Sequence, residues 1–210
     1  MTHPRAVRAS LASIALAVGA GLAGCSGEDA AEPSFAVSTA ADGSTYNSAD
    51  VAFATDMVQH HAQAVAMAVV ADGRPLDPEV ETLKNVIREA QVPEIETMSD
   101  WLVAWGEPVP ETMMGHGAAD HGAPLSEGME GMDADMPGMM TADEMAGLEN
   151  ASDADFQDLW LELMLEHHRG AVSMAENEVT EGEDADAVAL AEDVVTSQGA
   201  EIETMEALLG

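Results

Sequence analysis

The sequence predicts an all-α protein: a four-helix bundle built from two duplicated helical hairpins, with a methionine-rich flexible loop between them. The composition is 47% hydrophobic but only 3% aromatic, and few segments alternate in the manner of strands. Apolar residues recur instead at helical spacing, and one motif occurs twice, 107 residues apart. Neither hairpin alone buries much surface, so we expect the two copies to pack together around a pseudo-twofold axis.

The first 24 residues have the features of a secretion signal. Arg5 and Arg8 precede an apolar run from 11 to 23, which is too short to span a bilayer comfortably. The run ends in Leu22-Ala23-Gly24-Cys25, which resembles the lipobox of bacterial lipoproteins. That resemblance implies cleavage before Cys25, lipidation of its thiol and a protein anchored to the cell membrane on its extracytoplasmic face. The alternative is an ordinary secretory signal with an incidental cysteine.

Cys25 is the only cysteine, and this limits the chemistry of the mature chain. No internal disulfide can form, and a lipidated thiol cannot bind a metal, so methionine must supply the sulfur of any soft-metal site. Residues 25–47 are rich in small and polar residues without an apolar period. They are predicted to be a flexible tether ahead of a helical domain at 48–210.

The chain is strongly acidic, with a formal net charge of −34, and removal of the signal would take away two arginines and no acidic residue. This charge excludes nucleic acid as a partner, because that binding depends on basic residues meeting phosphates. It also concentrates cations near the surface, although a merely solvated acidic surface is the plainer interpretation. The expected partners are metal ions, and the membrane through the lipid anchor; the oligomeric state stays open.

The two copies correspond without a gap, which divides the domain into repeat one (48–105), a linker (106–150) and repeat two (151–210). The run Glu94-Ile95-Glu96-Thr97-Met98 recurs as residues 201–205. The other informative matches are Met57 with Met164, His60 with His167, His61 with His168, Met67 with Met174, and Gln91 with Gln198.

Each repeat is predicted to form two helices. In repeat one, a helix from Ser48, its expected N-cap, to about 71 ends at the Gly-Arg-Pro sequence of 73–75. Asp77 and Pro78 begin a second helix that runs to about 105. Pro93 lies inside this helix and is expected to kink or split it near Gln91.

In repeat two, Ser152 and Asp155 resemble a capping box at the start of a helix that runs to about 179. The last helix is expected from about 184 to 209. In the linker, Thr141 and Glu144 make a capping box for a short helix that ends near 148, and the rest of the linker is expected to be mobile.

The repeated motif places candidate metal ligands on one helix stripe. Met57, His60 and Met67 are spaced i, i+3 and i+10, and His61 lies about 100° round the helix. Imidazole suits copper and zinc, and thioether favours Cu(I). The alternative is that the methionines fill the core and the histidines are satisfied by hydrogen bonds. Because the set occurs twice, the sequence favours a copper site, although another soft or borderline metal could bind there. The candidate ligands are His60, His61, Met57, Met67, His167, His168, Met164 and Met174.

The second motif, Gln-x-x-Glu-Ile-x-x-Met, adds weaker candidates. Met98 and Met205 are possible further ligands, and Gln91, Glu94, Gln198 and Glu201 could orient the histidines from behind. Structural pairing between helices is the plainer interpretation of these polar residues.

The linker carries a second concentration of soft ligands, predicted to be a secondary metal-capture loop. Thioethers carry no proton to lose and form no disulfides, so they suit an oxidising compartment. A low-complexity linker without function is the alternative. The residues are Met113, Met114, His116, His121, Met129, Met132, Met136, Met139 and Met140.

Taken together, these motifs resemble the DUF305 family of bacterial proteins. The family pattern is Phe-x-x-x-Met-x-x-His-His-x-x-Ala-x-x-Met-Ala followed by Gln-x-x-Glu-Ile-x-x-Met. Phe53 begins the first match, and Trp160 replaces the phenylalanine in the second. The resemblance covers about 47–210 and implies a ferritin-like four-helix bundle, some of whose relatives bind copper.

Three functions are carried forward from the sequence. The favoured one is an extracytoplasmic protein that binds copper, as Cu(I) or Cu(II), for sequestration or delivery, with no catalytic residues. The second is a ferritin-like metal-dependent oxidase. Against it, the position three before each histidine pair is Met57 or Met164, where a di-iron site would use glutamate. The third is a helical interaction module at the cell surface, with methionines as an adaptable contact surface.

Overall fold

The computed structural model describes residues 35–112 and 136–210. A short antiparallel hairpin of β1 (Ser38–Thr39) and β2 (Thr45–Tyr46) precedes the helices. The helices of the described part are α1 (Ser48–Val70), α2 (Pro78–Trp105), α3 (Ala142–Glu149), α4 (Phe156–Glu181) and α5 (Ala185–Leu209). The structure confirms the predicted all-α fold.

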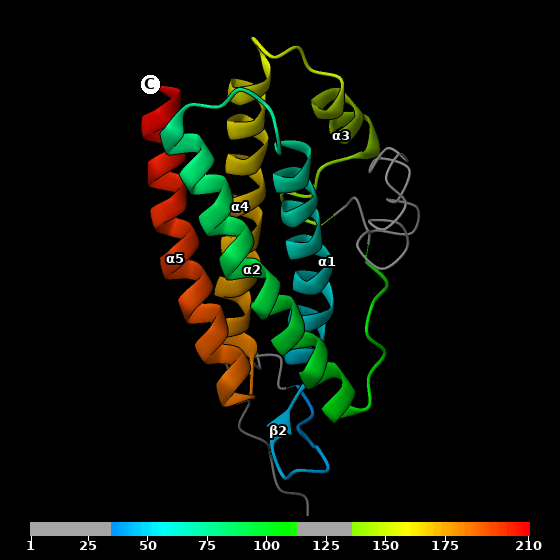
Figure 1. The fold of residues 1–210 in the computed structure, drawn as a ribbon. Helices are drawn as coiled ribbons and strands as arrows, with labels where there is room; N and C mark the ends of the chain where they lie inside the picture. The colour runs from blue at the N-terminus through cyan, green and yellow to red at the C-terminus, as the bar shows by residue number, and fades with distance from the viewer. Residues whose placement is uncertain (1–34, 113–135) are drawn as a thin grey trace, which may run out of the picture. The chain divides into compact units, whose positions relative to one another are not determined.

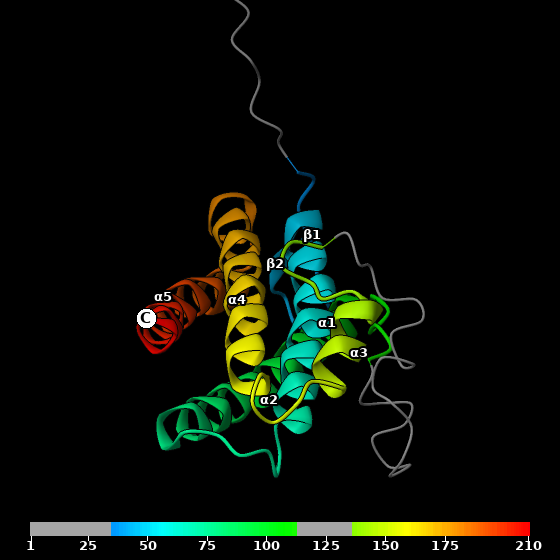
Figure 2. The same cartoon turned by 90° about the horizontal axis from the view of Figure 1, so that it is seen from above.

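The two repeats form two helical hairpins that lie side by side (Figure 1). α1 packs on α2, α4 packs on α5, and the hairpins meet mainly through α1 and α4, which run in opposite directions. The short helix α3 lies against α1 and α4 (Figure 2). The core between the hairpins is therefore lined by the two helices that carry the Met-x-x-His-His motifs. None of the described helices is long and apolar enough to cross a membrane.

Each repeat holds the turn of the other through the start of its first helix. The buried Asp50 carboxylate accepts hydrogen bonds from the backbone N–H groups of Glu183 (3.0 Å) and Asp184 (2.9 Å) in the turn before α5. At the opposite end, the Gln157 side-chain oxygen accepts from the backbone N–H of Asp77 at 2.7 Å. Asp50 corresponds to Gln157 and Asp184 to Asp77 at the repeat offset. The pseudo-twofold relation is thus built from reciprocal hydrogen bonds as well as apolar packing.

Two predicted caps differ in detail. The N-cap of α1 is Asn47, not Ser48, and it forms a capping box with Asp50. The N-cap of α4 is Asp155 instead of Ser152, because the Ser152 hydroxyl donates to the Asp155 carboxylate (2.6 Å) and leaves the helix backbone without a side-chain cap. The capping box of Thr141 and Glu144 is present at the start of α3, as expected.

Pro93 was expected to kink or split α2, and the structure contradicts the split. The helix continues from Pro78 to Trp105. Pro93 and Glu89, whose carbonyl loses its helical donor, are both exposed, so water can satisfy that carbonyl. Ile87 and Met98 are fully buried on either side of the proline, so packing holds both halves in register.

The end of the expected tether is structured. The β1–β2 hairpin lies within it, and the Tyr46 hydroxyl donates to the Trp105 carbonyl at 3.0 Å. The two aromatic rings stack at 5.0 Å between centroids. The segment before α1 is therefore attached to the end of α2.

Candidate metal centre

The four motif histidines lie in the middle of α1 and α4, and all four are completely buried. The rings of His60 and His167, one from each repeat, are in contact, with centroids 3.7 Å apart and planes tilted by 39°. Ala64 and Ala171, one turn further along each helix, are fully buried and small, which lets the helices approach. The two copies of the motif therefore meet in one place.

His61 and His168 are each held by a glutamate from the second helix of their own repeat. The Nε2 atom of His61 donates to Glu94 on α2 at 2.7 Å, and that of His168 donates to Glu201 on α5 at 2.9 Å. A carboxylate that accepts from Nε2–H fixes the ring tautomer and leaves Nδ1 with a lone pair for a metal. Glu94 and Glu201 thus have the geometry expected of groups that orient ligands.

Several imidazole nitrogens in this cluster have no hydrogen-bond partner. They are Nδ1 of all four histidines and also Nε2 of His167. A buried nitrogen without a partner costs about 1–3 kcal/mol, which a bound metal ion could offset. Burial, reinforced by the neighbouring His61, lowers the pKa of His60 to about 3. Burial and the adjacent His60 lower the pKa of His167 well below its ordinary value. These rings are therefore neutral at physiological pH, as metal ligation requires.

The motif methionines form two groups, one on each side of the histidines along the bundle. The first contains the fully buried Met57 and Met98, with the half-buried Met174 packed against it. The second contains Met67, Met164 and Met205, all fully buried, together with two methionines from beyond the motifs, Met140 and Met145. Each group combines both repeats because α1 and α4 are antiparallel.

Oxygen and nitrogen side chains alone do not complete a site. In the described part of the chain, no three His, Cys, Asp or Glu side chains are grouped so that they could hold a metal ion. A metal in this interior would need thioether sulfur, a turn of the histidine rings, or both. The donor set of imidazole with thioether fits copper, and fits a hard cation poorly.

The glutamines of the second motif make no described hydrogen bond to the histidines. Gln91 is buried, with neither side-chain polar atom hydrogen-bonded, and the Oε1 atom of buried Gln198 also lacks a partner. Of the four expected orienting residues, the two glutamates are the ones with a described hydrogen bond to a histidine ring.

The methionine-rich linker is divided by the structure. Met113, Met114, His116, His121, Met129 and Met132 lie outside the described residues. Met136, Met139 and Met140, expected in the mobile capture loop, are instead buried against the bundle, with exposed fractions of 8%, 6% and 4%. Met140 is held there by the Gln63 side chain, whose amide N–H donates to the Met140 carbonyl and whose oxygen accepts from the Met140 N–H.

Sequence reasoning missed the neighbours of His60. The Nε2 atom of His60 donates to the Pro137 carbonyl at 3.1 Å. The sequence gives only a weak signal: Gln63 and Gly170 correspond at the repeat offset and differ, but so do several other pairs within the motif.

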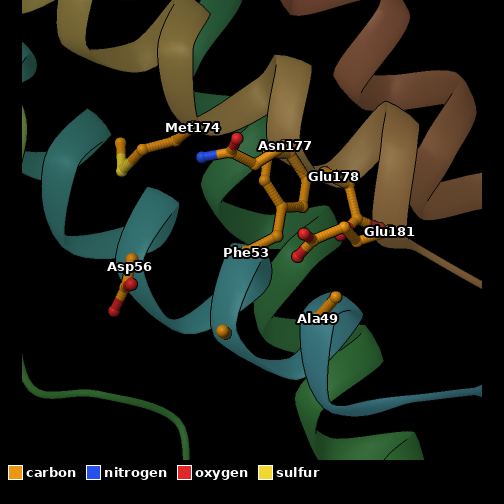
Figure 3. Close-up of a pocket in the computed structure, with 8 residues that line it drawn as sticks. Ala49, Phe53, Asp56, Met174, Asn177, Glu178 and Glu181 are labelled. Carbon is orange, nitrogen blue, oxygen red and sulfur yellow. The ribbon is translucent and has the colours of Figure 1, made fainter. Parts of the chain in front are cut away.

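A pocket of about 210 Å³ opens beside Met174, between the start of α1 and the end of α4 (Figure 3). Phe53 and Met174 give it an apolar part, and Asp56 and Glu181 give it an acidic part. An acidic mouth next to a candidate thioether ligand would attract cations.

The model of the family described as a domain of unknown function, DUF305, matches residues 50–209. The chain belongs to the DUF305 family. Among solved structures it is similar to a DUF305 protein of Streptomyces coelicolor described as secreted, with 35% identity and a TM-score of 0.63 over 77% of this chain and 91% of that one. A DUF305 fragment from Deinococcus radiodurans is 31% identical, with a TM-score of 0.62 over 77% and 95% of the two chains.

The DUF305 similarities also include a metal-bound protein. CopM in its Cu(II)-bound form is 28% identical, with a TM-score of 0.58 over 76% of this chain and 95% of that one. CopM structures in Cu(I)-bound and Ag-bound forms match comparably. No curated protein matches the chain.

Proposed function

We propose that this DUF305 protein binds copper between its two repeats and serves in copper sequestration or delivery outside the cytoplasm. The observation that carries the proposal is the cluster of four buried histidines, whose unpartnered nitrogens lie between two buried methionine groups. His60 and His167 are in contact, which supports a shared centre over two separate ones.

The residues divide into ligands and supports. Nδ1 of His61 and of His168 would bind the metal while Glu94 and Glu201 hold the opposite nitrogens. His60 and His167 add imidazoles already neutral at physiological pH. Thioethers from the two methionine groups would favour Cu(I), and the imidazoles would also accept Cu(II). The similarity to CopM, which was crystallised with Cu(I), Cu(II) and silver, supports a soft-metal site.

The extracytoplasmic location rests on the lipobox at Cys25, which lies outside the described residues, and is supported by the relative described as secreted. A binding role is favoured over an oxidase because methionine, not glutamate, stands three residues before the first histidine of each pair. The carboxylates that reach the centre, Glu94 and Glu201, are engaged with histidines. The linker residues from 113 to 132 would add a second site for metal capture.

Competition for Cu(I) against a chelator of known affinity tests the proposal. The experiment compares the mature chain with a variant in which His60, His61, His167 and His168 are all replaced by alanine. A matched control replaces the six soft ligands between 113 and 132 with serine and leaves the bundle intact. We expect the four-histidine variant to lose the tightest binding and the linker control to keep it. Equal affinity of the mature chain and a folded four-histidine variant would overturn the bundle site.

A further inference from the structure

The five residues from Met136 to Met140 cross the bundle surface as a strap over α1 and α4, ahead of α3 (Figure 2). On α1, the Gln63 side-chain amide donates to the Met140 carbonyl at 2.9 Å and accepts from the Met140 N–H at 2.7 Å. This pair of bonds replaces those that a backbone partner would make, and all the atoms involved are buried. The strap is therefore attached by specific bonds as well as by its apolar side chains.

On α4, the strap lies directly on the helix backbone. A Cβ atom at Gly170 would lie 2.0 Å from the Pro137 carbonyl oxygen, and one at Gly138 would lie 2.6 Å from the Glu166 carbonyl oxygen. Gly138 also has a φ of +73°, a conformation that favours glycine. Only glycine fits at either point of contact.

The two repeats treat this position differently. Gln63 and Gly170 correspond at the repeat offset, yet one holds the strap and the other makes room for it. The strap hydrogen-bonds the ring of only one of the two central histidines: His60 donates to the Pro137 carbonyl at 3.1 Å, whereas no hydrogen bond joins the strap to the His167 ring. The strap therefore interacts differently with the two repeats: it hydrogen-bonds Gln63 and His60 of the first and lies on the backbone of the second at Gly170.

We propose that the strap is a positioning and closing element of the copper site. It fixes His60 in the tautomer that leaves Nδ1 for the metal, and it must lift before metal is exchanged. Gln63 and Gly170 are the positioning residues that hold it. This inference rests on the proposed function, because it concerns the regulation of that same site.

A matched pair of glycine variants tests the strap. Gly170→Ala places a methyl group where the Pro137 carbonyl lies, while alanine favours the α4 helix itself. Gly199→Ala in α5 makes the same change within a helix, and its Cβ would meet nothing within 4 Å. The rate of Cu(I) transfer to a chelator and the hydrogen exchange of the Met140 amide are measured in both variants. The tautomer of His60 is read by NMR of ¹⁵N-labelled histidine.

We expect Gly170→Ala to raise Cu(I) transfer and Met140 amide exchange by about tenfold, the loss of roughly one net hydrogen bond, and to mix the His60 tautomers. Gly199→Ala should match the wild type. Gln63→Met, which removes both bonds at similar volume, should reproduce the Gly170→Ala result and serves if that variant does not fold. Tight Cu(I) binding by the wild type with unchanged transfer rates in the strap variants would overturn the strap's role alone. A wild type that binds no Cu(I) would overturn the proposed function, and the strap's role in exchange with it.

Discussion

The two glutamates behind His61 and His168 provide the most quantitative prediction about the centre. Each accepts a hydrogen bond from a fully buried imidazole, and the glutamate side chains are only 21% and 14% exposed. A hydrogen bond to a charged group contributes about 1.5–3 kcal/mol. Loss of a partner that orients a metal ligand typically lowers affinity by about 10- to 100-fold. We therefore expect Glu94→Ala to weaken Cu(I) binding by about that factor.

The size of the effect should follow the chemistry of the replacement. Glu94→Gln keeps an acceptor oxygen for Nε2–H but loses the charge, so its loss of affinity should be smaller than that of Glu94→Ala. Glu201→Ala should match Glu94→Ala, because the geometry is repeated at 2.9 Å. Glu96→Gln, on the same helix but exposed, is the control. Cu(I) competition titrations give the affinities, and thermal unfolding reports the stability of each variant. Unchanged affinity in a folded Glu94→Ala protein would show that the pair is only structural.

Three further predictions concern stability. Asp50→Ala should lower the free energy of unfolding by about 3 kcal/mol, because the N–H groups of Asn47, Glu183 and Asp184 all lose their acceptor. Gln157→Ala, at the half-exposed equivalent site, should cost about 1 kcal/mol, because only the Asp77 N–H loses its acceptor. Equal costs in denaturant titrations would contradict the reasoning. Burial and the neighbouring Asp50 raise the pKa of Glu178 to about 9, so the folded state keeps a proton that the unfolded state releases above pH 4.5. The free energy of unfolding should therefore fall as pH rises from 4.5 to 9, by up to about 1.4 kcal/mol per pH unit. If Glu178→Gln showed the same pH profile as the wild type, this explanation would be refuted. Pro93→Ala should stabilise α2 by about 1–3 kcal/mol in thermal unfolding without altering Cu(I) affinity, and a destabilised variant would show that the proline is required.

The helices and the position of the histidines followed from the sequence because they depend on local periodicity and on an exact internal repeat. The Met-x-x-His-His motif predicts a buried stripe on each of two helices, and a bundle brings such stripes together. The N-caps at Asn47 and Asp155 were missed by one and three residues because a cap is decided by which side chain reaches a free N–H group.

The interactions that the sequence did not reveal join residues far apart in the chain. The bonds of Asp50 to the turn before α5 span more than 130 residues, and those of Gln63 to Met140 span 77. Composition predicted that Met136, Met139 and Met140 belong to a mobile linker. Nothing in the composition of the linker reveals that Gln63, on α1, bonds this segment. Pro93 was overestimated as a breaker since local propensity carries no information about the packing on either side of it.

X-ray absorption spectroscopy of the Cu(I)-loaded protein tests the central claim most directly. It should be recorded on the variant whose linker ligands between 113 and 132 are serine, so that only the bundle can contribute. The proposal requires imidazole nitrogen together with thioether sulfur around the copper, and loss of the nitrogen contribution in the four-histidine variant. A copper environment without histidine nitrogen, or one unchanged by removal of the four histidines, would contradict a centre shared between the repeats.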